Sequence, residues 1–243
     1  MSPTRYKRIL LKLSGEALAS PNGFGVDPQY AMGVVSTISK LSQTGVQIAI
    51  VVGGGNYLRG GKSNFKNTIN RATADQMGML ATMMNALALR DMLMASGVKA
   101  EVLSAKAVEG VFPAAGAHIS KKLLQDGNVV IFAGGTGNPF VTTDSAASLR
   151  AVEIDADAIL KATTVDGVFD ADPKINPEAK KYHHVSFDEV VQKELAVMDL
   201  SAFTQCRDYN IPICVFNMEQ SENLLKVMSG QNIGTWVSSG DEK

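Results

Sequence analysis

The sequence contains few of the residues on which many enzymes depend. It has two cysteines, three histidines and one tryptophan in 243 residues. Cys206 and Cys214 have neither metal-ligand spacing nor the density of a disulfide framework, so we expect both to be reduced, buried thiols of a cytosolic protein. The sequence also has no marked excess of one charge sign, because 23 Lys and Arg residues balance 24 Asp and Glu residues. We therefore expect no general attraction to nucleic acid or membrane, and any anion site must be local.

Several motifs are absent as well. No G-x-x-x-x-G-K-[ST] is present, which excludes a P-loop NTPase, and no G-x-G-x-x-G follows the first predicted strand, which argues against a Rossmann dehydrogenase. His118, His183 and His184 lie outside serine-hydrolase and zinc-protease motifs. No apolar run reaches the roughly 20 residues of a membrane span, and the N-terminal one is too short for a signal peptide. Without a histidine base or an activated nucleophile, the sequence favours chemistry by positioning and charge neutralisation, as in phosphoryl transfer.

Strand-like and helix-like segments alternate along the chain. The expected strands are rich in Val, Ile and Leu, as is typical of parallel strands covered by helices on both faces, and span residues 8–13, 47–52, 100–104, 128–133, 158–163 and 211–216. Helices are expected from Pro28, capped by Asp27, to near Gly45 and at 73–96, 142–153, 187–194, 200–209 and 219–228. This α/β pattern predicts one domain over residues 1–243, a three-layer α/β/α sandwich around a mainly parallel sheet.

Two glycine-rich turns follow predicted strands. One comprises residues 53–56, and the other runs from Gly134 to Asp144. Glycine lets backbone N–H groups approach phosphate oxygens, and Thr142, Thr143 and Asp144 can cap a helix whose positive end faces the same place. Two such turns indicate two phosphorylated ligands, although either alone could be an ordinary turn between a strand and a helix.

Lysines lie near the ends of two other predicted strands. Lys12 is followed by a turn at Gly15, and Lys161 by a longer glycine-containing segment with Phe169 and Asp172. Because ligands bind at the carboxyl ends of parallel strands, Lys12 can face phosphoryl oxygens, while Phe169 can stack on a purine and Asp172 can reach ribose hydroxyls. A surface lysine beside a turn, or a turn anchored by an aromatic ring, would give the same patterns.

Together these motifs resemble those of the bacterial UMP kinases of the amino acid kinase superfamily. The likeness is nearly end to end and is carried by residues 7–18, 53–60, 74–82, 135–144, 161–172 and 197–200. Other superfamily members share the glycine turns and lysines. The Met-Gly-Met-Leu-Ala-Thr run of the long predicted helix, combined with the Gly-Thr-Gly-Asn-Pro-Phe turn, is specific to the UMP kinases.

The resemblance implies transfer of the γ-phosphoryl group of ATP to UMP, giving UDP and ADP, with Mg²⁺. It implies Lys12 and Lys161 as the lysines that neutralise the transferring group, and Asp144 and Asp199 as the carboxylates that orient the lysines and the metal. The residues implied for UMP are Gly54, Asp75, Thr136, Gly137, Asn138, Pro139, Phe140, Val141, Thr142 and Thr143. Those implied for ATP are Lys12, Ser14, Gly15, Gly55, Arg59, Thr163, Phe169 and Asp172. No metal ligand is assigned.

The resemblance further implies a cytoplasmic homohexamer of pyrimidine nucleotide biosynthesis that UTP inhibits and GTP often activates, with the long Met-rich helix at a subunit contact. Effector contacts of some relatives correspond to Ser20, Pro21, Asn22, Gly23, Phe24 and Gly25, a segment that could equally be a surface hairpin. Two positions depart from the family pattern. Val141 replaces an aromatic residue and Thr164 replaces a common lysine, which bears on nucleotide affinity and effector response.

Two other functions fit part of the pattern. The same fold could phosphorylate a carboxylate or a carbamate, or the protein could be a nucleotide-sensing regulator without activity. The presence of both lysines and both aspartates disfavours the second of these.

Overall fold

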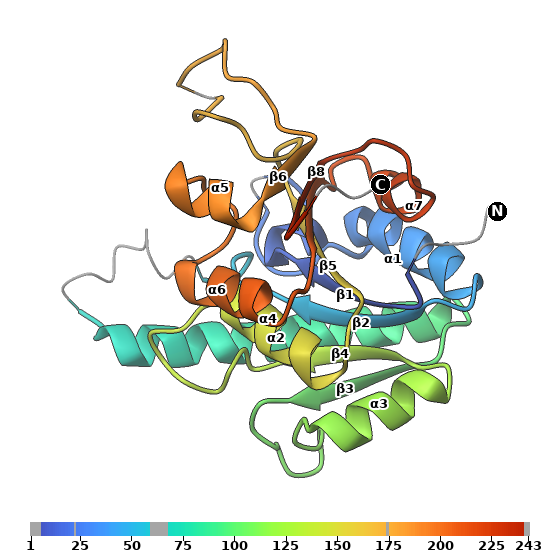
Figure 1. Cartoon of the computed structure of the whole chain (residues 1–243). Helices are drawn as coiled ribbons and strands as arrows, with labels where there is room; N and C mark the ends of the chain where they lie inside the picture. Colours follow the sequence, from blue (N-terminus) through green and yellow to red (C-terminus); the bar gives the residue numbers. More distant parts are fainter. Residues whose placement is uncertain (1–5, 22, 59–67, 174, 241–243) are drawn as a thin grey trace.

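An eight-stranded sheet forms the middle layer of the computed structural model, which describes residues 6–21, 23–58, 68–173 and 175–240 (Figure 1). The strands are β1 (Arg8–Leu13), β2 (Gln47–Val52), β3 (Ala100–Ser104), β4 (Val129–Ala133), β5 (Ala158–Thr163), β6 (His184–Ser186), β7 (Ile213–Asn217) and β8 (Thr235–Ser238). Their order is β3-β4-β2-β1-β5-β7-β8-β6. Only the β7–β8 pair is antiparallel among these strands. The carboxyl ends of β1, β2, β4 and β5 consequently meet at one edge of the sheet.

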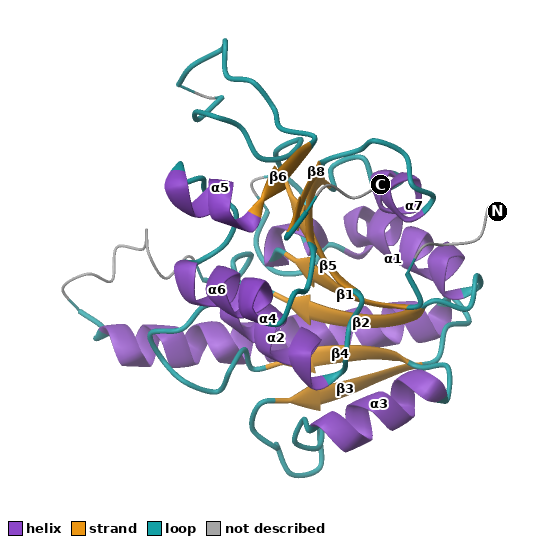
Figure 2. Ribbon diagram, in the orientation of Figure 1, coloured by secondary structure: helices purple, strands orange, loops and turns teal. Residues whose placement is uncertain are grey.

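Helices cover both faces of the sheet (Figure 2). One face carries α1 (Pro28–Ser42), α2 (Arg71–Ala95) and α7 (Asn223–Met228), and the other carries α3 (Ala117–Gln125), α4 (Thr143–Glu153), α5 (Phe187–Gln192) and α6 (Leu200–Asp208). A short 3-10 helix, η1 (Gly15–Leu18), follows β1. Each face has its own apolar core. The predicted three-layer α/β/α sandwich is confirmed.

Side-chain alternation along β1 explains how one strand supplies both cores and the site. Ile9, Leu11 and Leu13 belong to the core beneath α1 and α2, whereas Leu10 belongs to the core beneath α4. Burying each of these side chains contributes roughly 1.5 to 3 kcal/mol. Lys12 has the parity of Leu10, so it projects to the α4 face.

The sequence predicts most element bounds correctly. β1, β2, β3 and β5 have the predicted bounds, and the Asp27 side chain caps α1 by accepting from the N–H groups of Gln29 and Tyr30. The prediction of a strand at 211–216 is wrong by two residues at its start, since β7 begins at Ile213. The helix predicted from 219 begins only at Asn223, because the Asn217 side chain accepts from Glu219 N–H and forms a turn that competes with the helix.

Four elements, namely β6, β8, α3 and η1, are not predicted from the sequence. The strands β6 and β8 have three and four residues, too few for a clear alternating pattern. Helix α3 buries only Ser120 and Leu124, and no side chain caps its start at Gly116, so a start signal is missing from the sequence. β6 and β8 lie at one end of the sheet order, whereas α3 packs on β4 and β2.

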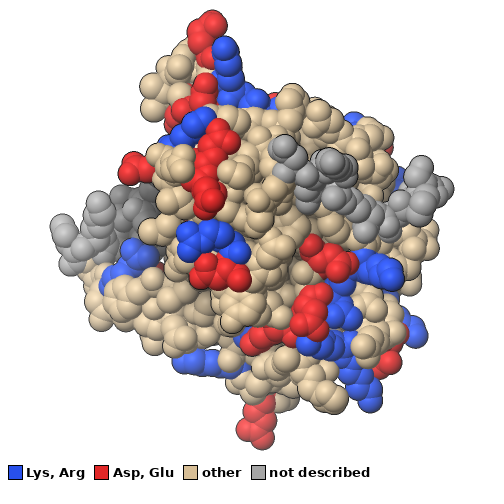
Figure 3. All heavy atoms as spheres, viewed as in Figure 1, with Lys and Arg blue, Asp and Glu red and all other residues tan. Residues whose placement is uncertain are grey.

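The charged side chains on the face shown in Figure 3 are mixed, with Lys and Arg beside Asp and Glu. This distribution agrees with the formal net charge of −1. Within the described ranges, no helix combines the length and apolarity that crossing a membrane requires.

Candidate active site

Lys12 and Lys161 converge because their strands lie side by side in register. β1 and β5 are parallel, and the two lysines are direct partners in the ladder. Lys12 Nζ lies 3.0 Å from Asp144 Oδ1, and Lys161 Nζ lies 2.8 Å from Asp144 Oδ2. The three side chains are only 12 to 17% exposed. The structure thus places one carboxylate between two ammonium groups.

The environment of this cluster shifts two pKa values. Burial by itself raises the pKa of Asp144, but the attraction and hydrogen bonds of the two lysines outweigh it and bring the pKa below 3.8. Burial lowers the pKa of Lys161 below 10.5, even though Asp144 opposes the change. The two ammonium groups supply N–H donors that suit an incoming anionic group, while Asp144 and the nearby Asp199 carboxylate balance their charge.

Two helix N-termini meet beside the lysines. Thr142 caps α4 by accepting from the Asp144 N–H at 3.1 Å. The Thr142 hydroxyl also donates to Asp199, the residue that precedes α6. Lys161 Nζ donates to the Val197 carbonyl at 2.6 Å, and Val197 lies in the segment between α5 and α6 that also carries Asp199. All four predicted catalytic residues therefore lie in one network, with the positive ends of two helix dipoles beside it.

The turn after β4 is attached to α2. The Phe140 N–H donates to Asp75 Oδ2 at 2.8 Å, and Asp75 forms an ion pair with Arg71 at 2.8 Å. The Gly134 N–H donates to the Thr82 hydroxyl at 2.8 Å. Phe140 has φ of 66°, a left-handed conformation that costs a residue with a side chain roughly 1 kcal/mol or more. The turn of residues 136–143, predicted to hold UMP, therefore lies against Asp75; we call it the acceptor turn.

Glycine at position 54 is required by the close approach of α2. A Cβ on Gly54 would lie 2.7 Å from the Gly78 carbonyl oxygen and 2.9 Å from Ala81 Cβ. The turn after β2 can pack directly on the helix only without a side chain here. This contact joins a second predicted UMP residue to the helix that carries Asp75.

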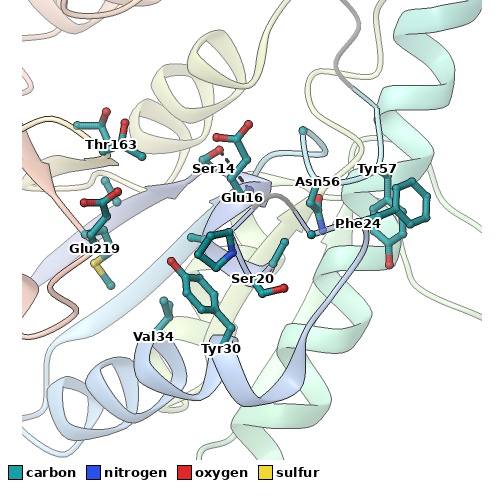
Figure 4. Close-up of a pocket in the computed structure, with 18 residues that line it drawn as sticks. Ser14, Glu16, Ser20, Phe24, Tyr30, Val34, Asn56, Tyr57, Thr163 and Glu219 are labelled. Carbon is teal, nitrogen blue, oxygen red and sulfur yellow. Dashed lines mark hydrogen bonds between the residues drawn. The ribbon is translucent and has the colours of Figure 1, made fainter. Parts of the chain in front are cut away.

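A cavity of about 660 Å³ opens at the carboxyl ends of β1, β5 and β7 (Figure 4). Its volume falls in the range of small-molecule sites. Three predicted ATP residues line it, namely Ser14, Gly55 and Thr163. Four residues of the predicted effector segment line it too, namely Ser20, Pro21, Gly23 and Phe24. Donor and effector predictions therefore fall on one cavity, which we call the donor cavity.

The walls of the donor cavity differ in chemistry along its length. Glu16 and Glu219 bring carboxylates to it, and Tyr30 projects from α1 beside Val34. Figure 4 shows Thr163 and Glu219 at one end and Phe24 with Tyr57 at the other. Acceptor groups between apolar walls suit the amino and hydroxyl groups of a nucleoside.

Other predicted ATP residues lie elsewhere. Phe169 is half-buried in the long connection between β5 and β6, where it pairs with Lys181, and Asp172 is exposed in the same connection, which extends away from the sheet in Figure 1. Neither belongs to the residues that line the donor cavity. Arg59, predicted for ATP, and Asn22, predicted for the effector, lie outside the described residues. The roles of these four residues stay predictions.

Comparison with known proteins gives independent evidence for the family of this chain. The model of the amino acid kinase family matches residues 7–217. The chain belongs to the amino acid kinase family. It is similar to a uridylate kinase of Francisella tularensis subsp. holarctica, with 59% identity over 234 residues that cover 96% of this chain and 94% of that protein. A uridylate kinase of Coxiella burnetii is 53% identical over 97% of this chain and 96% of its own length.

The fold has a solved counterpart. The crystal structure of UMP kinase from Bacillus anthracis superposes with a TM-score of 0.93 at 37% identity, covering 98% of this chain and 97% of that one. The strand order and helix layers described above are thus those of a solved amino acid kinase fold.

The site offers few ligands to a metal ion. The described ranges contain no group of three or more His, Cys, Asp or Glu that could hold one. Mg²⁺ usually keeps several waters and is bound through one or two carboxylates together with substrate phosphates. Asp144 and Asp199, beside the lysines, fit an ion held in that shared way.

Sequence reasoning missed several side chains on α2. Arg71 holds Asp75, Thr82 holds the turn after β4, and Asn85 is buried against the turn after β2. Positions 71, 75, 78, 82 and 85 are spaced by three or four residues, so they share one face of the helix. We call this the polar face of α2. The spacing of these positions in the sequence is a signal that could have indicated this face.

Proposed function

We propose that this protein is a UMP kinase, which transfers the γ-phosphoryl group of ATP to UMP and releases ADP and UDP. The observation that carries the proposal is the convergence of Lys12 and Lys161 on Asp144, beside the N-termini of α4 and α6. The uridylate kinases among its relatives support UMP as the acceptor.

The two nucleotides occupy the two sides of the lysines. ATP lies in the donor cavity, with its phosphates toward Gly15 and Lys12 and its nucleoside toward Thr163. UMP lies at the acceptor turn, and its ribose hydroxyls donate to Asp75. An ionised carboxylate has about four lone-pair sites, so the bonds to Phe140 and Arg71 leave capacity for the ribose.

Transfer relies on charge placed in advance. In a loose transition state the migrating group carries negative charge on its three equatorial oxygens, which Lys12 and Lys161 neutralise while a UMP phosphate oxygen attacks in line. Asp144 holds both ammonium groups so that they need not reorganise. One preorganised contact of this kind is worth about 3 to 4 kcal/mol, or 10² to 10³ in rate. Mg²⁺, when bound, would neutralise charge on the donor phosphates, and Asp144 and Asp199 are the carboxylates that would hold it.

The decisive experiment is an assay of ADP release with ATP and Mg²⁺ over a panel of acceptors. The panel contains UMP, CMP, dTMP and GMP together with carbamate and N-acetylglutamate. We expect turnover with UMP far above that with every other acceptor, and its loss in Lys12→Ala. Faster turnover of a carboxylate or carbamate would assign a different kinase of the family, and nucleotide binding without ADP release would indicate a sensor.

Assembly and regulation form a second part of the proposal. We propose a cytoplasmic homohexamer that serves pyrimidine nucleotide synthesis, inhibited by UTP and activated by GTP. Exposed apolar side chains on α2 support a subunit contact there, with Leu80, Met84 and Met94 each about half exposed. Light scattering of the purified protein and rates with each effector test these points.

A further inference from the structure

Two buried asparagines form a closed pair beneath the site. Asn56 ends the turn after β2 and Asn85 lies on the polar face of α2, with exposures of 6% and 0%. Asn56 Nδ2 donates to Asn85 Oδ1 at 2.9 Å, and Asn85 Nδ2 donates to Asn56 Oδ1 at 2.7 Å. The pair thus joins a strand end to a helix 29 residues away in the chain.

The remaining amide hydrogens reach two backbone segments. Asn56 Nδ2 also donates to the Gly25 carbonyl at 2.8 Å, and Asn85 Nδ2 donates to the Gly53 carbonyl at 2.7 Å. The Gly25 N–H returns a bond to the Asn56 carbonyl at 3.0 Å. All four amide N–H donors of the two side chains are therefore used. Because carbonyls only accept, this arrangement also determines which way each amide faces.

The Asn56 side chain also lies against the turn at Gly15. A Cβ on Gly15 would lie 2.4 Å from Asn56 Oδ1, and 2.9 Å from the backbone nitrogen of Gly55. The turn that follows Lys12 thus closes directly over the asparagine amide. Figure 4 shows Asn56 at the wall of the donor cavity.

The pair therefore lies where the parts of the site meet. Gly15 and Gly55 belong to the donor side and Gly54 to the acceptor side, while Asp75 is ten positions before Asn85 on α2, about 15 Å along the helix axis. A buried amide pair that uses every donor is rigid, whereas a partly satisfied one is costly, so this pair can fix the spacing of the parts around it.

We propose that Asn56 and Asn85 are positioning residues that set the separation between the turn at Gly15, the turn of residues 53–56 and α2, and so hold both nucleotides in line for transfer. This inference rests on the proposed function, since it concerns the alignment of the same two substrates. Neither asparagine needs to touch the reacting atoms.

The test is a double-mutant cycle on the full-length enzyme with Asn56→Ala, Asn85→Ala and the double variant. Each single change leaves buried carbonyls and one amide without partners, and we expect it to raise the KM for both ATP and UMP by about tenfold. The double variant should show about the same KM values as either single variant, because each single change already breaks the pair. KM values that rise as the product of the single effects would overturn the proposal.

A matched control separates positioning from stability. Asn128 Nδ2 donates to the Leu123 carbonyl at 3.1 Å near the amino end of β4, at the opposite edge of the sheet from the site. Asn128→Ala is expected to lower the unfolding temperature and leave both KM values unchanged. A loss of folded enzyme alone reduces the rate per milligram but not KM. Unchanged KM values in the Asn56 and Asn85 variants would therefore overturn the inference.

Asn85→Asp covers the case in which an alanine variant does not fold. It keeps the shape and the acceptor oxygen but cannot donate to the Gly53 carbonyl, so the same rise in both KM values is expected. If the parent enzyme turns over UMP and this variant has parental KM values, only the positioning inference fails. If the parent enzyme does not turn over UMP, the proposed function fails and the inference fails with it.

Discussion

Replacing Asp144 by asparagine would remove the negative charge that lies between Lys12 and Lys161. The change keeps the size of the side chain and leaves two ammonium groups facing a neutral amide in a largely buried site. At separations of 3.0 and 2.8 Å, each ion pair has a gross attraction of about 5 to 6 kcal/mol at an effective dielectric constant of about 20. Desolvation offsets much of this, and breaking a buried pair costs about 3 to 5 kcal/mol net.

The pH dependence of this loss gives a sharper test. In the folded variant the lysines lack their carboxylate, so the pKa of Lys161 should fall further below 10.5 than it does in the parent. The unfolded chain then binds more protons than the folded one, and stability rises with pH in that window. The stability gap between parent and variant should therefore narrow between about pH 7 and about pH 9.5.

Urea unfolding followed by circular dichroism at both pH values measures the gap. Asp155→Asn is the control, because Asp155 pairs with Lys121 at 2.5 Å but is 70% exposed, and a change under about 1 kcal/mol is expected there. Asparagine also tolerates the positive φ of 52° at this position. A loss below about 1 kcal/mol for Asp144→Asn, or a gap that does not change with pH, would refute the charge-bridge argument.

Three further outcomes follow from the same geometry. Because burial lowers the pKa of Lys161, kcat should begin to fall at a pH below 10.5 as the pH rises. Lys161→Arg should remove that fall, because a guanidinium stays charged. The same dependence of kcat on pH in the parent and in Lys161→Arg would contradict this. Asp75→Ala should raise the KM for UMP by about tenfold or more and leave that for ATP nearly unchanged, which steady-state kinetics with each substrate varied would measure. Burial, with a smaller effect of the Asp144 charge, raises the pKa of Cys206 to about 12, so iodoacetamide should label it only in urea, and rapid labelling of the native protein would show that the thiol is accessible.

The sheet could be predicted where its signals are local. The bounds of β1, β2, β3 and β5 follow from runs of Val, Ile and Leu, because strands buried on both faces need no polar alternation. The start of α1 follows from Asp27 and Pro28, a cap and a first-turn residue that act within a few positions. Lys12 and Lys161 could be paired in advance because carboxyl ends of parallel strands meet at one edge.

What the sequence did not reveal depends on contacts between distant segments. The pairing of Asn56 with Asn85, and of Phe140 N–H with Asp75, joins residues 29 and 65 positions apart, and no local pattern encodes either. The donor cavity is another such feature, since residues before α1, after β2 and after β7 line it together. Strand β8 has too few residues for its sequence to indicate that it runs antiparallel to β7, between β7 and the terminal strand β6.

The alternation of side chains along β1 constrains how this protein can vary in length. Lys12 reaches Asp144 because an even number of positions separates it from Leu10 on the same face. Deleting one residue between Arg8 and Lys12 would turn the lysine toward the core under α1 and bring a leucine to the site. Deletion of one residue here should therefore be far less tolerated than most single substitutions in the strand. Descendants of this gene should keep the number of residues between Arg8 and Lys12 constant, even where the apolar residues between them change.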